Sequence, residues 1–88
     1  MNQPAHVPLD RLPVGSQAVV RQLGGGKELA NRLAAMGLSL GSSIKVLQNR
    51  GQGPVLVLVR DTRIALGRGE AMKILTEELP GERPPTTA

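Results

Sequence analysis

The chain has 88 residues and a formal net charge of +4 at pH 7, and it contains no Phe, Trp, Tyr or Cys. A chain of this length encloses one hydrophobic core, so we expect a single domain filled by aliphatic side chains. The missing aromatic rings exclude the usual groove for proline-rich peptides and the usual stacking platform for single-stranded nucleic acid. The missing cysteines exclude disulfides, thiolate metal sites and a thiol nucleophile.

The two ends of the chain contain several prolines and few apolar residues that a core could bury. We expect residues 1–8 to form a flexible N-terminal arm and residues 80–88 a flexible C-terminal tail, around a folded domain at residues 9–79. No segment has the apolar length of a membrane span or the pattern of a signal peptide. The sequence therefore predicts a cytoplasmic protein.

The first expected elements are a strand at residues 16–23 and a helix at residues 27–36, separated by three glycines. β-branched residues and a rough alternation indicate the strand. The helix is indicated by apolar residues at helical spacing, which are Leu29, Ala30, Leu33, Ala34 and Met36. Gly37 follows the helix, and a left-handed conformation there would let Leu38 fold back toward Leu33.

The rest of the chain has the pattern of short strands joined by turns. After a turn at Gly41, we expect strands at residues 43–49, 55–60, 64–66 and 73–76. The first two of these form a hairpin, because a glycine-rich connection separates them. We therefore predict a mainly β fold, a small SH3-like β-barrel of about five strands with one short helix inserted after the first strand, since closure removes exposed strand edges.

No arrangement of residues in the sequence points to catalysis. His6 is the only histidine, and it lies in the expected N-terminal arm, away from any serine held in a rigid pocket. The glycine run before Lys27 lacks the first glycine of a phosphate-binding loop and places Glu28 where a Ser or Thr should bind magnesium. The carboxylates are scattered, with no His or Cys spacing to organise a metal site. We expect no enzymatic activity and no tightly bound cofactor, with weak adventitious binding of a divalent metal at most.

The segment Val55–Val59 is apolar at every position, although a strand on a small barrel should be apolar on one face only. If its three valines face the core, the two leucines between them must point outward. The helix or a chain terminus covers these leucines in one interpretation, and a protein partner covers them in the other. We predict a partner-binding face with a charged rim, made of Leu47, Leu56, Leu58, Arg60 and Arg63.

The string NRLAAMGLSLGSSIKVLQNRGQGPVLV, at residues 31–57, resembles the core pattern of the ferrous-iron transport protein A (FeoA) family. This pattern consists of a basic residue and Leu, then Gly, a hydrophobic residue, a second Gly four positions on, a strand, and a Gly-Pro-hydrophobic hairpin. The resemblance implies an SH3-like barrel with a short helical insertion. It further implies an accessory protein of the ferrous-iron permease (FeoB), a membrane protein through which the iron would cross.

The resemblance assigns structural roles by position. The residues that match the helix-to-strand corner of the family are Leu33, Gly37, Leu38 and Gly41, and those that match its hairpin are Gly53 and Pro54. Leu56 and Leu58 depart from the more polar outward face that such a domain would have. The resemblance therefore leaves the oligomeric state of this chain open.

Two other functions remain as alternatives. The same barrel occurs as the C-terminal regulatory domain of metal-dependent repressors of the diphtheria-toxin-repressor type, but we find no helix-turn-helix in this sequence. Basic residues dominate between Arg11 and Lys73, which favours an acidic partner or weak binding of nucleic acid. The missing aromatics argue against an RNA-binding barrel. We therefore expect the permease, or a second copy of this protein, as the partner and no nucleic acid.

Overall fold

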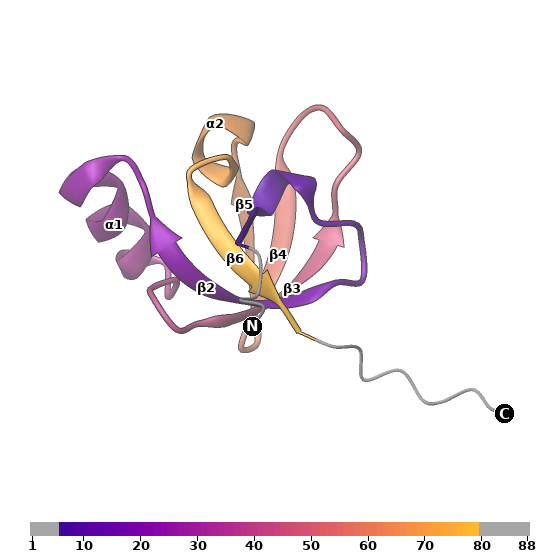
Figure 1. Cartoon of the computed structure of the whole chain (residues 1–88), viewed down its shortest axis with the longest axis horizontal. Coiled ribbons are helices and arrows are strands. Elements are labelled where there is room, and N and C mark those ends of the chain that lie inside the picture. Colours follow the sequence, from indigo (N-terminus) through magenta and orange to yellow (C-terminus); the bar gives the residue numbers. More distant parts are fainter. Residues whose placement is uncertain (1–5, 80–88) are drawn as a thin grey trace, which may run out of the picture.

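The computed structural model describes residues 6–79, which form one antiparallel sheet with a helix at one side (Figure 1). The elements in chain order are β1 (Val7–Pro8), the 3-10 helix η1 (Leu9–Arg11), β2 (Gln17–Leu23), α1 (Gly26–Ala35), β3 (Ser43–Gln48), β4 (Val55–Val59), β5 (Thr62–Leu66), α2 (Arg68–Ala71) and β6 (Ile74–Glu78). The predicted fold class, mainly β with a helix after the first long strand, is confirmed.

The sheet has 6 strands in the order β1-β6-β2-β3-β4-β5. Within residues 6–79, β1 and β5 lie at opposite ends of this order and do not pair with each other, so the sheet is open where we predicted a closed barrel. The additional strand arises because Val7–Pro8 pairs with β6. Val7 and Pro8, which we assigned to the N-terminal arm, are therefore part of the sheet. The predictions for residues 1–5 and 80–88 lie outside the described residues.

α1 ends at a backbone closure around Gly37. Gly37 has a φ of 95°, and its N–H donates to the Ala34 oxygen at 2.9 Å. The N–H of Leu38 donates to the Leu33 oxygen at 2.9 Å. These two bonds satisfy carbonyls of the last turn that have no partner inside the helix, in the pattern of a Schellman motif. The closure returns Leu38 to the core, where both leucines are fully buried.

The core lies between the inner face of the sheet, α1 and the segments around η1. Alternate residues of the long strands point into it, because successive side chains of a strand face opposite sides. Only aliphatic side chains make up the described core cluster, which consists of Leu9, Leu12, Ala18, Val20, Leu29, Leu33, Leu38, Ile44, Val46, Val55, Val57, Val59, Ile64, Leu66, Ala71 and Ile74. The prediction of an aliphatic interior is confirmed.

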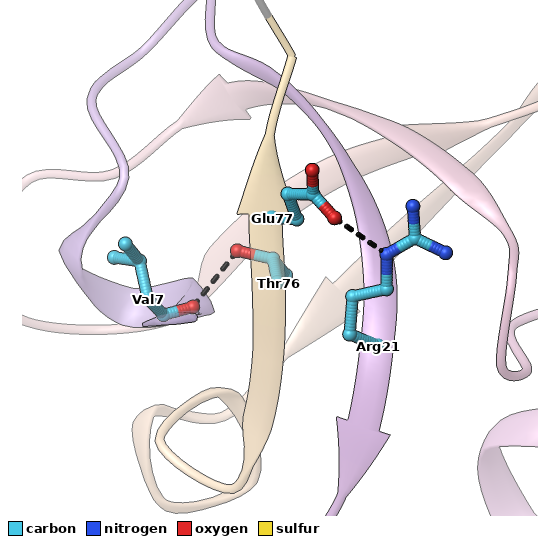
Figure 2. Close-up of polar contacts among 4 residues, drawn as sticks. All are labelled: Val7, Arg21, Thr76 and Glu77. Carbon is cyan, nitrogen blue, oxygen red and sulfur yellow. Dashed lines mark hydrogen bonds and ion pairs between the residues drawn. The ribbon is translucent and has the colours of Figure 1, made fainter. Parts of the chain in front are cut away.

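A buried threonine fastens the short strand β1 to β6. Thr76 is fully buried, and its Oγ1 donates a hydrogen bond to the Val7 oxygen at 2.8 Å (Figure 2). On the outer side of the same strand, Glu77 Oε1 accepts a hydrogen bond from Arg21 Nε at 2.8 Å (Figure 2). Arg21 lies at a bulge of β2, between the paired residues Val20 and Gln22. Ladder bonds, a buried hydroxyl and an ion pair therefore hold β6 in place between β1 and β2.

A polar cluster joins the two ends of the open sheet. η1 directly follows the edge strand β1, and α2 begins two residues after the other edge strand, β5. Arg68 of α2 donates to the backbone oxygens of Gly53 at 2.8 Å and Asp10 at 3.3 Å. Asn49, directly after β3, donates from Nδ2 to the backbone oxygens of Asp10 at 2.9 Å and Leu12 at 2.8 Å. Side-chain hydrogen bonds thus connect regions that a closed barrel would join by a strand ladder.

Candidate protein-docking face

β4 buries its valines and leaves its leucines on the outer face of the sheet. Val55 and Val57 are 0% exposed and Val59 is 3% exposed. Leu56 and Leu58 alternate with them and are half-buried. This alternation is the period of two that a strand imposes on its side chains. An apolar pair therefore lies on the side of β4 that faces away from the core.

Leu58 lies in register with exposed cations on both neighbouring strands. Lys45 of β3 is its partner on one side, and Arg63 of β5 is its partner on the other. Gln17 of β2 is in turn the partner of Lys45. Residues directly opposite each other point to the same face, with Cβ atoms about 4.5–5.5 Å apart. Gln17, Lys45, Leu58 and Arg63 therefore form one row across the outer face, which we call the Leu58 row.

Leu56 lies in a neighbouring row that carries less charge. Its partner on β5 is Ala65. On β3 its partner is Gln48, and Leu47 lies at the bulge between Val46 and Gln48, where the register shifts. Leu47 is half-buried, as Leu56 is. The structure thus places two of the predicted leucines at the bulge and the third, Leu58, among the cations.

A hollow of about 290 Å³ lies at one end of the Leu58 row. Its walls are Gln17, Ser43, Ile44, Lys45, Leu58, Arg60 and Leu79. Leu79 follows β6, and its N–H donates to the Gln17 oxygen at 2.8 Å. The last described residue therefore borders Leu58, whereas α1 lies beside β2 (Figure 1). Within residues 6–79, Leu58 thus shares this hollow with Leu79 and is not covered by α1.

Arg60 occupies an unusual backbone conformation at the edge of this hollow. It has a φ of 61°, and within residues 6–79 no other residue except glycine has a positive φ. Arg60 and Asp61 form the two-residue connection between β4 and β5, whose flanking residues Val59 and Thr62 are paired. Tight turns of this kind favour Gly, Asn or Asp at a position with positive φ. The exposed Arg60 also lines a second hollow of about 310 Å³ with Gly41, Ser42, Ser43 and Val59.

The cations of this face have no carboxylate within ion-pair distance among the described residues. The ion pairs in residues 6–79 are Arg21 with Glu77 at 2.8 Å and Arg32 with Glu70 at 3.2 Å. Lys45, Arg60 and Arg63 belong to neither pair and are exposed. The part of the outer face over β3, β4 and β5 therefore combines uncompensated positive charge with half-buried leucines.

The residues expected to have structural roles lie away from the leucines and cations of the outer face, except that Gly41 borders the second hollow. Leu33 and Leu38 are in the core, and Gly37 and Gly41 have positive φ values of 95° and 86°. Gly53 has a φ of 75°, and its carbonyl accepts the bond from Arg68. Pro54 is exposed directly before β4. Their side chains and backbone shape the corner and the hairpin that frame the outer face.

Sequence reasoning did not single out Lys45, Gln17 or Leu79 as members of the face. The alternation of β3 does place Lys45 on the side opposite Ile44 and Val46, so the signal for its direction was present. Its position beside Leu58 depends on the register between β3 and β4, which the sequence does not specify. Leu79 enters the hollow because β6 pairs with β2, a contact between distant parts of the chain.

Within residues 6–79, no three His, Cys, Asp or Glu side chains come together to hold a metal ion. The same residues contain no helix that is long and apolar enough to cross a membrane. The outer face described above is thus the strongest candidate for function in this part of the chain.

Comparison with known proteins places the fold in a defined class. The crystal structure of an iron uptake regulatory protein, FeoA, matches with a TM-score of 0.80 and 32% identity, over 85% of this chain and 100% of that chain. A manganese-dependent transcriptional repressor matches with a TM-score of 0.78 and 23% identity, over 90% of this chain and 45% of that chain. At this identity the second likeness shows a common fold only. The chain is thus an SH3-like domain of the type found in FeoA proteins and in part of such repressors.

The sequence comparisons identify the family. The Fe(2+) transport protein A of Methanocaldococcus jannaschii is 38% identical over 71 residues, which are 81% of this chain and 85% of that protein. The family model described as the FeoA domain matches residues 7–78. The chain belongs to the FeoA family, as the resemblance at residues 31–57 predicted.

Proposed function

We propose that this chain is a non-enzymatic accessory protein of ferrous-iron uptake, which docks on the ferrous-iron permease (FeoB) at the cytoplasmic side of the membrane. Membership of the FeoA family supports a role in iron transport. The observation that carries the docking is the outer face of β3, β4 and β5, where Leu58 lies in register with two cations that have no carboxylate partner among residues 6–79. Leu56 and Leu58 form its apolar part, and Arg60 and Arg63 its charged rim.

The energetics of such a face suit a contact of modest affinity. Complete burial of a leucine contributes about 1.5–3 kcal/mol of transfer free energy, and the half-buried leucines of β4 would supply part of that amount each. The cations, which have no ion-pair partner among residues 6–79, add orientation and a faster association rate more than affinity. A partner with an acidic surface would be stabilised by burial of the leucines and attracted by the cations.

The experiment replaces the apolar part of the face. The double variant Leu56→Ser with Leu58→Ser removes it, and the matched variant Val14→Ser with Leu40→Ser makes the same kind of change at apolar residues that are 59% and 61% exposed elsewhere. Binding to the purified permease in detergent micelles is measured for both variants and for the unchanged protein. We expect the first variant to lose at least about tenfold in affinity, which is about 1.4 kcal/mol, and the second to bind normally.

The possible outcomes separate the interpretations. If the first variant unfolds, as its amide NMR spectrum would show, the leucines support the fold and the docking face lies elsewhere. Normal binding by a folded first variant would also place the docking surface elsewhere. If the unchanged protein does not bind the permease but forms dimers that this variant abolishes, the face joins two copies of the chain and the permease role is wrong.

A further inference from the structure

The Leu58 row has a charge pattern that defines the chemistry of its partner. Lys45 and Arg63 flank Leu58 on adjacent strands, and all three side chains point to the outer face. With neighbouring Cβ atoms about 4.5–5.5 Å apart, the two cations stand roughly 10 Å from each other with the leucine between them. Their aliphatic stems can lie against Leu58 while the charged ends extend outward.

The positive charge of the row is not compensated within the described part of the chain, unlike the charge on the neighbouring strands. Arg21 on β2 has Glu77 on β6 at 2.8 Å, so that part of the outer face carries a paired cation. Lys45 and Arg63 have no carboxylate at a comparable distance in residues 6–79. A ligand that supplied two carboxylates would thus form ion pairs with Lys45 and Arg63, as Glu77 does with Arg21.

The hollow beside the row favours a ligand that presents an apolar group. Leu58 and Leu79 contribute its apolar walls, and Lys45 and Arg60 its cations. Its volume of about 290 Å³ is at the lower end of the range for small-molecule pockets, so it fits one inserted aliphatic side chain better than a cofactor. Arg60 holds its position through a left-handed backbone, a conformation that a non-glycine residue seldom adopts without a functional reason.

We propose that the Leu58 row binds an acidic segment of a protein, in which an aliphatic side chain enters the hollow and carboxylates on either side of it pair with Lys45 and Arg63. This inference deepens the proposed function and rests on it, because the permease would present the segment. A helix could present such a pattern, since residues three and four positions apart share one face at about 5–6 Å spacing. An acidic protein segment fits better than nucleic acid, because the hollow has leucine walls that suit an aliphatic side chain and the chain has no aromatic ring for base stacking.

The first test reverses the charge of the row. The variant Lys45→Glu with Arg63→Glu is compared with Arg11→Glu with Arg50→Glu, which changes the net charge equally at exposed residues outside the row. Affinity for the purified permease is measured at low and at physiological salt. We expect a loss of at least about tenfold for the first variant and little change for the second, with a weaker salt dependence once the row is reversed. Equal losses of affinity in both variants would overturn the proposed acidic segment. The proposal that the protein docks on the permease would still stand.

The second test is independent of the permease. The probe is a synthetic amphipathic helical peptide that carries Glu one turn before and one turn after a Leu, and the control peptide has Gln at both positions. We expect the Glu peptide, and not the Gln peptide, to shift the NMR signals of Lys45, Leu58 and Arg63. If neither peptide shifts them, or if a short generic RNA shifts them and the Glu peptide does not, the proposal is wrong whatever the permease does. The neutral variant Lys45→Gln with Arg63→Gln, which should abolish the shifts, replaces the reversed variant if that one does not fold.

Discussion

Arg68 donates a hydrogen bond from Nη2 to Asn49 Oδ1 at 2.7 Å, and this pair connects α2 to the end of β3. Asn49 extends the connection to η1 through the backbone oxygens of Asp10 and Leu12. The two side chains thus join three regions that are distant in the sequence. Because β1 and β5 do not pair within the described residues, this polar pair is a main link between the ends of the sheet.

We expect Asn49→Ala to lower the free energy of unfolding by about 1–3 kcal/mol, because it removes the two hydrogen bonds to the Asp10 and Leu12 oxygens and the bond from Arg68, and leaves the Leu12 oxygen without its side-chain donor. Urea denaturation, followed by far-UV circular dichroism, measures the effect. Asn31→Ala makes the same chemical change at an exposed residue of α1 and should not destabilise the protein. An unchanged denaturation midpoint for Asn49→Ala would show that the cluster does not stabilise the fold.

Gly37→Val should cost about 1–2 kcal/mol of stability, because a β-branched residue resists a positive φ. A Cβ atom at Gly37 would meet no atom within 4 Å, so the cost comes from the backbone and not from a clash. Gly37→Asn is the matched variant, since Asn tolerates the left-handed region better. We expect the denaturation midpoints to follow the order Gly, Asn, Val. A valine variant as stable as the asparagine variant would contradict a backbone origin.

Arg60→Gly should raise the stability by up to about 1 kcal/mol, because glycine adopts the φ of 61° without the strain of a side chain. The same variant should weaken docking if Arg60 forms part of the charged rim. Stability and binding would then change in opposite directions, as expected for strain held at a functional site. Arg60→Lys keeps both the side-chain charge and the strain, so its midpoint should not move. A less stable glycine variant would mean that the arginine side chain stabilises the turn.

Ferrous iron should not bind stoichiometrically to the protein with micromolar affinity. The possible ligands are scattered in the sequence, and within residues 6–79 no three of them converge. Anaerobic titration calorimetry with ferrous iron measures this directly, and a GTP hydrolysis assay on the same sample tests the expected lack of activity. A single tight site per chain would show that the protein senses or carries the metal and does not act by docking alone.

Local patterns predicted those parts of the fold and the face that depend on a few neighbouring residues. The Gly37 corner follows from one helix end, and the opposite faces of Val57 and Leu58 follow from the strand period. The number of short strands and the need to cover their edges led to the SH3-like class, and the family resemblance implied the same class.

Contacts between distant residues could not be predicted in this way. β1 has only two residues, and it is a strand because Val7 and Pro8 meet Thr76 and Leu75 of β6. The residues around Asn49 and Arg68 in the sequence do not predict their hydrogen bond, because polar residues are common at the ends of strands and helices. The position of Lys45 beside Leu58 likewise depends on a bulge in β3 that no pattern in the sequence marks.

β4 has a further consequence for the folding of the chain. Because Val55–Val59 is apolar on both faces, a slip of one residue would exchange valines and leucines and still bury an apolar set, so hydrophobicity alone does not fix its register. Such a segment also tends to aggregate before it is paired. Pro54 and Arg60 flank it as gatekeepers, one by lacking an N–H and the other by its charge. Pro54→Ser should therefore increase light scattering during refolding while the denaturation midpoint stays the same. This result would show that the proline raises the yield of folded protein and does not change its stability.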